Sequence, residues 1–326
     1  MVLQRRALSS YPKAVCNDGT TAAYYAPQEA HKTGQTVLIY LEGGGACFTA
    51  DSCRERCNGG GEDSALCTTA TDQEIDRTDT IWSSDPAENP GLHDSYKVVL
   101  KTGSSGNFIG GSERHACCQV YVPYCTSDVY SGRRDSEAAT GGFTFHGKYV
   151  MEAVIDNVVA QLDGASAYQL VLFGVSAGAY GVAINCDAVA EKVKGVHSDA
   201  DVRCVVDGTD FIPTTVALDG CDPLANNAAA ATFWQGSFDQ SCESELGASS
   251  PRCYVFSSYM WYIDTPFMVV APLEEIDGFI ITCAPEFPAN PDFWTRWRDA
   301  LVTLASQLLT VILNQQFPSK IFPGKT

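Results

Sequence analysis

The sequence predicts an α/β fold, in which a mainly parallel central sheet carries helices on both faces. Apolar segments of strand length alternate with segments of helical periodicity through the middle of the chain, an order typical of parallel sheets. Glycine-rich turns directly follow two of the strand segments. In such sheets ligands bind at the carboxyl ends of the strands, so we expect the functional site where these turns lie.

Each element of this fold follows from composition or periodicity. Residues 35–41 are an apolar run, and residues 148–162 place Val150, Val154, Val158 and Leu162 on one helical face. The expected strands are residues 35–41, 119–124, 168–173, 203–207 and 252–258. The expected helices are residues 148–162, 179–194 and 293–316.

Length and composition favour one elaborated domain over residues 1–326. Apolar residues make up 45% of the chain and charged residues 18%, which allows a substantial core, and no repeat or linker divides the sequence. The net charge of −18 argues against nucleic acid and anionic membranes as partners, because both bind basic surfaces. The longest apolar segment, residues 300–313, contains polar residues, so no membrane span is expected.

The 14 cysteines are even in number and scattered along the chain. Cys53 and Cys57 have no second pair of ligands to complete a zinc site, so we expect no metal. Several disulfides in a secreted protein are predicted, with a reduced enzyme containing buried thiols as the alternative. Residues 1–11 lack the apolar region of a signal peptide, and we expect the given chain to be truncated at both ends.

The turn at residues 174–178 has the G-x-S-x-G pattern between a strand and a helix, which is typical of a nucleophile elbow. Ser176 is therefore the candidate catalytic nucleophile, and the N–H of Ala177 is a candidate donor to an oxyanion. The alternative is a tight strand–helix turn in which the serine is incidental.

Gly43, Gly44 and Gly45 follow the strand at residues 35–41 and resemble the glycine-rich oxyanion loop of esterases. Without side chains, their N–H groups can approach a substrate closely. A phosphate-binding loop is the alternative, but the Lys and Ser/Thr of that motif are missing here.

Five segments together resemble the pectin acetylesterase / Notum family of serine carboxylesterases. They are residues 14–20, 41–48, 82–90, 124–132 and 174–181, in family order. The resemblance implies an α/β-hydrolase-like fold and a serine esterase without metal or cofactor. It also implies two disulfides, Cys16–Cys125 and Cys47–Cys53.

The resemblance assigns Ser176 as nucleophile and Gly44 and Ala177 as oxyanion donors, with Gly43 and Gly45 beside them. For the acid it favours Asp264, after the strand expected at residues 252–258; Asp277 is a poorer rival, and Asp264 could also be a solvated loop carboxylate. Asp207 and Asp210 match a family segment that shapes the loop near the site.

The catalytic base is missing, because no histidine follows Asp264. The five histidines are His31, His93, His115, His146 and His197. None of them falls where the family places its base, and His146 is interpreted as a capping or surface residue. Our hypothesis is that the base lies beyond residue 326. Residues 102–118 are an apparent insertion relative to the family.

The leading function is a secreted serine esterase that removes acetyl groups from a cell-wall or extracellular polysaccharide. In the family that the chain resembles, members that accept a long lipid acyl chain carry bulky aromatics in this loop. By that resemblance the small residues Gly45 and Ala46 favour the acetylesterase over a Notum-like esterase that removes a fatty acyl group from a protein. The net charge favours a neutral or heavily esterified glycan. A catalytically silent glycan-binding protein is the alternative from another class.

Overall fold

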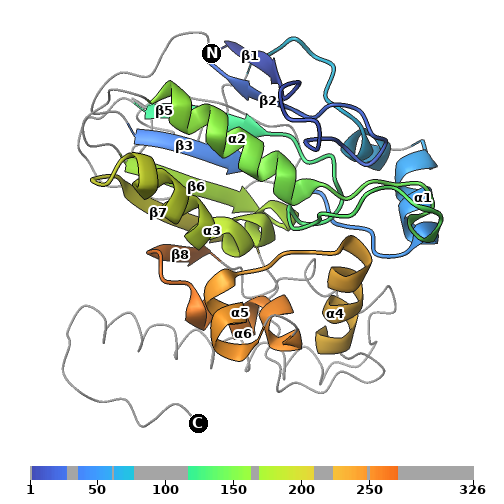
Figure 1. The fold of residues 1–326 in the computed structure, drawn as a ribbon. Coiled ribbons are helices and arrows are strands. Elements are labelled where there is room, and N and C mark those ends of the chain that lie inside the picture. Colours follow the sequence, from blue (N-terminus) through green and yellow to red (C-terminus); the bar gives the residue numbers. More distant parts are fainter. Residues whose placement is uncertain are drawn as a thin grey trace, which may run out of the picture.

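The fold is built on an eight-stranded sheet with the strand order β4-β1-β2-β5-β3-β6-β7-β8 (Figure 1). The computed structural model describes residues 2–27, 36–60, 62–76, 117–162, 169–208, 223–247 and 250–270. The strands are β1 (Val2–Ala7), β2 (Ala23–Ala26), β3 (Thr36–Leu41), β4 (Glu74–Asp76), β5 (Cys117–Val122), β6 (Gln169–Val175), β7 (Asp201–Asp207) and β8 (Phe267–Val270).

Strands β5, β3, β6, β7 and β8 form the parallel part of the sheet, and β1, β2 and β4 extend it with antiparallel pairs. The register aligns their carboxyl ends. Leu41 of β3 pairs with Gly174 of β6, Val175 pairs with Asp207 of β7, and Asp207 pairs with Val270 of β8. The glycine loop after β3 and the turn after β6 therefore share one edge of the sheet.

Two long helices, α2 (Gly147–Gln161) and α3 (Ala177–Val196), lie over the same face of the sheet (Figure 1). Both connections, β5–α2–β6 and β6–α3–β7, join parallel strands and run in one direction across the sheet, and right-handed crossovers then place their helices on one face. Apolar residues of both helices, such as Val154 and Ile184, pack with Ile39 and Leu172 in the main core.

Shorter helices flank this frame. They are α1 (Ala50–Asn58), α4 (Pro223–Trp234), α5 (Gln240–Leu246) and α6 (Phe256–Tyr259), with 3-10 turns η1 (Glu62–Cys67), η3 (Ala138–Thr140), η4 (Pro251–Tyr254) and η5 (Met260–Tyr262). The opposite face of the sheet carries a second buried cluster rich in aromatic side chains. Within it Tyr25 stacks on Tyr121, and Tyr40 packs against Phe173.

The structure confirms four of the five expected strands and the first two expected helices, with bounds shifted by a few residues. The strand expected at residues 252–258 is wrong, because this segment forms η4 and α6. Proline at the start of η4 favours a helical turn, and the Cys242–Cys253 disulfide ties that turn to α5. The strand comes later, as β8. The helix expected at residues 293–316 lies outside the described residues.

Disulfides cross-link loops and helices around the sheet, and one of them joins α3 to β7. Both pairings implied by the family resemblance, Cys16–Cys125 and Cys47–Cys53, are confirmed. Three further bonds are Cys57–Cys67, Cys186–Cys204 and Cys242–Cys253. A search of the described ranges finds no group of three or more potential metal ligands and no helix long and apolar enough to cross a membrane.

Candidate active site

Ser176 lies at the sharp turn between β6 and α3, in a backbone conformation that few non-glycine residues adopt. Its φ is 55° and its ψ is −123°. Its N–H donates to the carbonyl oxygen of Asp207 on the neighbouring strand at 2.9 Å, which holds the turn against β7. A strained serine at a strand–helix turn is the geometry of a nucleophile elbow.

The two glycines of the motif are required by close backbone packing. A Cβ on Gly174 would lie 2.3 Å from the carbonyl oxygen of Gly178. A Cβ on Gly178 would lie 2.1 Å from the carbonyl oxygen of Leu41 at the end of β3. Both neighbours are backbone atoms that cannot rotate away. Glycine is therefore required at both positions for α3 to pack this closely on the strands.

The glycine loop after β3 lies directly against this turn. A Cβ on Gly43 would be 3.1 Å from the Cβ of Ser176. Gly44 and Gly45 have φ values of 133° and 69°, in the region that favours glycine. Ala177 is buried at the first position of the 20-residue α3, where N–H groups have no partner within the helix. The structure thus brings the loop with Gly44 and the Ala177 amide next to Ser176, the candidate nucleophile.

Glu42 anchors the beginning of this loop, and sequence reasoning missed it. Its side chain is buried and accepts hydrogen bonds from the hydroxyl of Tyr121 at 2.7 Å and the N–H of Tyr124 at 2.9 Å. The hydroxyl of Tyr130 donates to the Glu42 carbonyl oxygen at 3.0 Å. The available signal in the sequence was an acidic residue between an apolar strand segment and three glycines.

The loop after β5 is organised by Asp128, which sequence reasoning also missed. Its buried carboxylate accepts from the Thr126 hydroxyl at 2.6 Å and from the N–H groups of Tyr130, Gly132 and Gly147 at 3.1, 3.2 and 2.8 Å. Burial raises the pKa of Asp128 to about 6, although these four donors act in the opposite direction. The carboxylate thereby closes the loop onto the start of α2.

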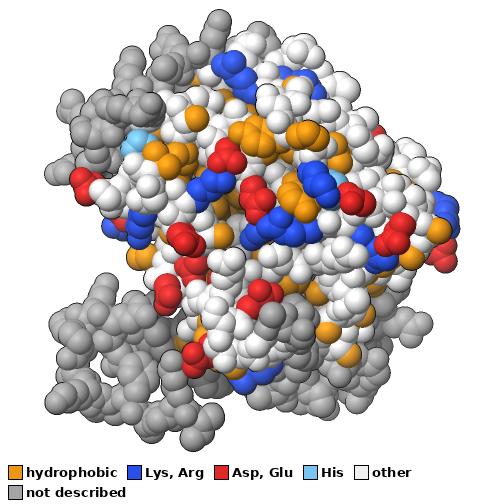
Figure 2. All heavy atoms as spheres, in the orientation of Figure 1, with side chains coloured by type: hydrophobic (Ala, Val, Ile, Leu, Met, Phe, Trp, Pro, Cys, Tyr) orange, Lys and Arg blue, Asp and Glu red, His pale blue; other side chains and the backbone are white. Residues whose placement is uncertain are grey.

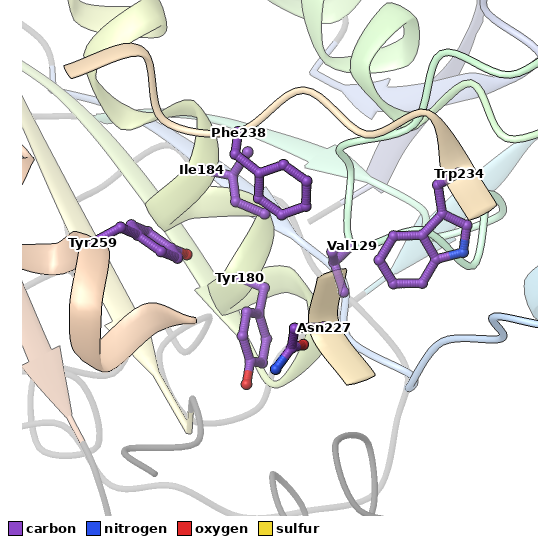
Figure 3. A pocket seen from close by; sticks show the side chains of 7 residues that line it. All are labelled: Val129, Tyr180, Ile184, Asn227, Trp234, Phe238 and Tyr259. Atoms are coloured by element: carbon purple, nitrogen blue, oxygen red, sulfur yellow. The ribbon is translucent and has the colours of Figure 1, made fainter. Parts of the chain in front are cut away.

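The loop around Asp128 is itself strained. Ser127, Val129 and Tyr130 have φ values of 50°, 49° and 59°. Val129 is β-branched, so a positive φ is a strong outlier for it. It lines a cavity of about 20 Å³ together with Tyr180, one helical turn after Ser176, and Trp234 of α4 (Figure 3).

The position of Asp264 argues against its predicted role as the acid. It precedes β8, so it lies toward the amino ends of the parallel strands, whereas Ser176 follows β6 at the carboxyl ends. Its N–H donates to the carboxylate of Asp187 at 2.9 Å. Asp187 is 11 residues along α3 from Ser176, or roughly 16 Å at 1.5 Å per residue. The rival Asp277 lies outside the described residues.

The two histidines in the described ranges, His146 and His197, are not placed as partners of Ser176. His146 lies at the start of α2, as expected, and occupies the N-cap position. Its side chain makes no cap hydrogen bond, and its ring is buried and contacts the Asp135 carboxylate at 2.9 Å, so it is neither a side-chain cap nor a surface residue. Burial lowers the pKa of His146, against the opposing effect of Asp135. His197 ends α3, at the far end of that helix from Ser176. The base beyond residue 326 stays a prediction.

A serine elbow beside an oxyanion-type loop on a mainly parallel sheet defines a protein of the α/β-hydrolase class. A structure titled as the Wnt deacylase Notum from Drosophila superposes with a TM-score of 0.72 at 24% identity, covering 94% of this chain and 82% of that one. The α/β-hydrolase-like fold expected from the resemblance is therefore confirmed.

The family model described as Pectinacetylesterase matches residues 5–119 and 115–273, and the chain belongs to this family. Pectin acetylesterase 5 of Arabidopsis thaliana is 27% identical over 306 residues, covering 91% of this chain and 63% of the relative. Human palmitoleoyl-protein carboxylesterase NOTUM is 29% identical over 241 residues, covering 71% and 42%. The chain thus spans less than two thirds of the length of these relatives.

Proposed function

We propose that this protein is a serine carboxylesterase that removes small acyl groups, most simply acetate, from an extracellular polysaccharide. The observation that carries the proposal is the strained Ser176, held against the Gly43–Gly45 loop with the Ala177 amide beside it. A nucleophile and two sources of oxyanion donors in contact are two of the parts that acyl transfer requires, beside a base and its orienting acid. The five disulfides in the described residues support an oxidising, extracellular location.

In this mechanism the Ser176 hydroxyl attacks the ester carbonyl while a base takes its proton. The developing oxyanion accepts hydrogen bonds from the N–H groups of Gly44 and Ala177, and the positive end of α3 adds to this stabilisation. The alcohol leaves with the proton, and water then hydrolyses the acyl-enzyme by the same route. Our proposal keeps the base beyond residue 326.

For the acid we propose a carboxylate that follows β8 in the sequence. The carboxyl end of β8 pairs with Asp207, whose carbonyl oxygen accepts from the Ser176 N–H, so the chain leaves β8 at the edge where the nucleophile lies. Glu274, Glu275 and Asp277 come next along the chain. Replacing each with its amide should identify the acid by its loss of turnover, whereas Asp264→Asn should retain it.

Two features support a small acyl group and a substrate without dense negative charge. Gly45 and Ala46 add little bulk to the loop beside Ser176. The face with α2 and α3 shows acidic and basic side chains interspersed (Figure 2), on a chain with net charge −18. A neutral or heavily esterified glycan therefore fits better than a free polyanion.

Turnover of p-nitrophenyl acetate and p-nitrophenyl octanoate by the complete gene product tests this proposal, with Ser176→Ala as the control. We expect a higher kcat/KM for acetate and none above background for the variant. Octanoate turnover that equals or exceeds acetate would instead favour a Notum-like deacylase, the second candidate, which the NOTUM relatives support. A folded protein that turns over neither ester and does not react with a fluorophosphonate would refute the esterase proposal and favour a catalytically silent glycan-binding protein.

A further inference from the structure

Arg56 of α1 joins the two loops that surround the nucleophile. Its Nε donates to the hydroxyl oxygen of Ser127 in the loop after β5 at 3.0 Å. Its Nη2 donates to the carbonyl oxygen of Gly44 in the glycine loop after β3. The third nitrogen, Nη1, lies 3.5 Å from where a Cβ on Gly45 would be. One half-buried guanidinium therefore contacts both loops at once.

The helix that carries Arg56 is itself fixed. Disulfides Cys47–Cys53 and Cys57–Cys67 tie α1 to the glycine loop on one side and to η1 on the other, and Arg56 lies between their cysteines Cys53 and Cys57. The capping box formed by Thr49 and Ser52 closes the first turn of α1. The guanidinium therefore acts from a rigid support.

The contacts call for arginine in particular. A guanidinium presents donors along one planar edge, so Nε and Nη2 can reach two acceptors in a fixed relative geometry. A lysine at position 56 has one compact ammonium on a flexible stem and can satisfy only one acceptor well. The planar shape of the Arg56 guanidinium, in addition to its charge, therefore allows it to bridge Ser127 and Gly44.

We propose that Arg56 is a positioning residue that fixes the orientation of the oxyanion loop. The Gly44 N–H is the proposed oxyanion donor, and holding the Gly44 carbonyl oxygen restricts rotation at this glycine. The Gly44–Gly45 peptide is planar, so the same contact directs the Gly45 N–H away from α1. Glycines at 44 and 45 rotate easily, and without this contact the peptide could turn and present a carbonyl oxygen to the developing negative charge. Arg56 thus acts through the loop and does not touch the reacting atoms; this role rests on the proposed esterase function.

Kinetics of Arg56→Ala and Arg56→Lys test the role, with Arg54→Ala as the matched control. Arg54 lies on the same helix and makes an exposed ion pair with Asp51. Loss of a direct oxyanion donor lowers kcat about 10²–10³-fold, so loss of its positioning contact should lower kcat by about 10- to 100-fold. We expect KM for p-nitrophenyl acetate to stay within about threefold, Arg56→Lys to remain impaired, and Arg54→Ala to match the wild type.

Two further readouts separate positioning from a general effect on folding. Ethylguanidine should restore part of the kcat of Arg56→Ala and leave Arg54→Ala unchanged. Hydrogen exchange of the peptide spanning residues 42–48 should speed up in Arg56→Ala, while exchange in β6 and α3 stays as in the wild type.

The outcomes distinguish this inference from the proposed function. An inactive wild type would refute the esterase proposal, and hydrogen exchange would still decide whether Arg56 holds the loop. Unchanged exchange at residues 42–48 in Arg56→Ala, or wild-type kcat in an active enzyme, would overturn the positioning role. An increase in KM confined to anionic esters would show instead that Arg56 binds substrate charge.

Discussion

The packing of α3 on β3 makes Gly178→Ala the sharpest test of the site. The added Cβ would begin 2.1 Å from the carbonyl oxygen of Leu41, and ordinary contact starts at 3.4 Å, so α3 and β3 must separate by about 1.3 Å. Forced overpacking of this kind costs about 1–3 kcal/mol of stability. Since Ser176 lies two residues before Gly178, the same shift moves the nucleophile away from the glycine loop, and a misplacement of about 1 Å can lower activity about 10²-fold.

Gly195→Ala in the last turn of the same helix is the matched control. No heavy atom lies within 4 Å of a Cβ built there. Alanine in a helix is favoured over glycine by about 0.5–1 kcal/mol, and the end of a helix should give the lower part of that range. Urea unfolding and p-nitrophenyl acetate turnover would be measured for both variants. If Gly178→Ala unfolds and turns over like Gly195→Ala, our account of the elbow packing is refuted.

Three other predictions concern strain, cross-linking and burial of charge. Ser176→Gly should be more stable than Ser176→Ala by about 1 kcal/mol in thermal unfolding, because glycine relieves a positive φ that alanine retains, and both should be inactive. Replacing Cys16 and Cys125 with serine should cost about 4–5 kcal/mol of unfolding free energy, since their disulfide closes a loop of sequence separation 109. Asp239 is the buried N-cap residue of α5, and its carboxyl group accepts from the Cys242 N–H at 2.8 Å. Asp239→Asn should flatten the pH dependence of stability between about pH 4 and 7. Burial raises the pKa of Asp239 to about 7, so the wild type loses stability as pH rises through that range, while asparagine keeps the cap on the Cys242 N–H and carries no charge. Greater stability of the wild type than of Asp239→Asn at pH 8 in urea titrations would contradict this account.

The parts of the site that the sequence predicted are those determined by local pattern. The elbow needs an apolar strand, two glycines around a serine and a helix, and all of these are consecutive residues. The glycine loop is equally local, because it directly follows its strand. Both segments therefore identified Ser176 and Gly43–Gly45 before any tertiary contact was known.

The parts that could not be predicted depend on contacts between distant residues. Arg56 meets Ser127 across 71 positions, and Glu42 meets Tyr121 across 79. No spacing rule connects such pairs. The structure argues against Asp264 as the acid for a related reason: that prediction relied on a strand at residues 252–258, where a disulfide and a proline favour short helices instead. Because β8 is Phe267–Val270, Asp264 precedes the amino end of this strand, whereas Ser176 follows the carboxyl end of β6.

Backbone strain is concentrated in one part of the candidate site, the loops that follow β5 and β6. Four of the five non-glycine residues with positive φ in the described ranges lie in the loops that follow β5 and β6, namely Ser127, Val129, Tyr130 and Ser176. Strained conformations persist only where the surroundings fix them, and here the buried carboxylates of Asp128 and Glu42 accept hydrogen bonds from the backbone N–H groups of Tyr130 and Tyr124. We therefore expect substitutions around this half of the site to lower stability and turnover together. The carboxylates after β8 lie outside the described residues, and loss of turnover in their amide variants is the measurement that assigns the acid among them.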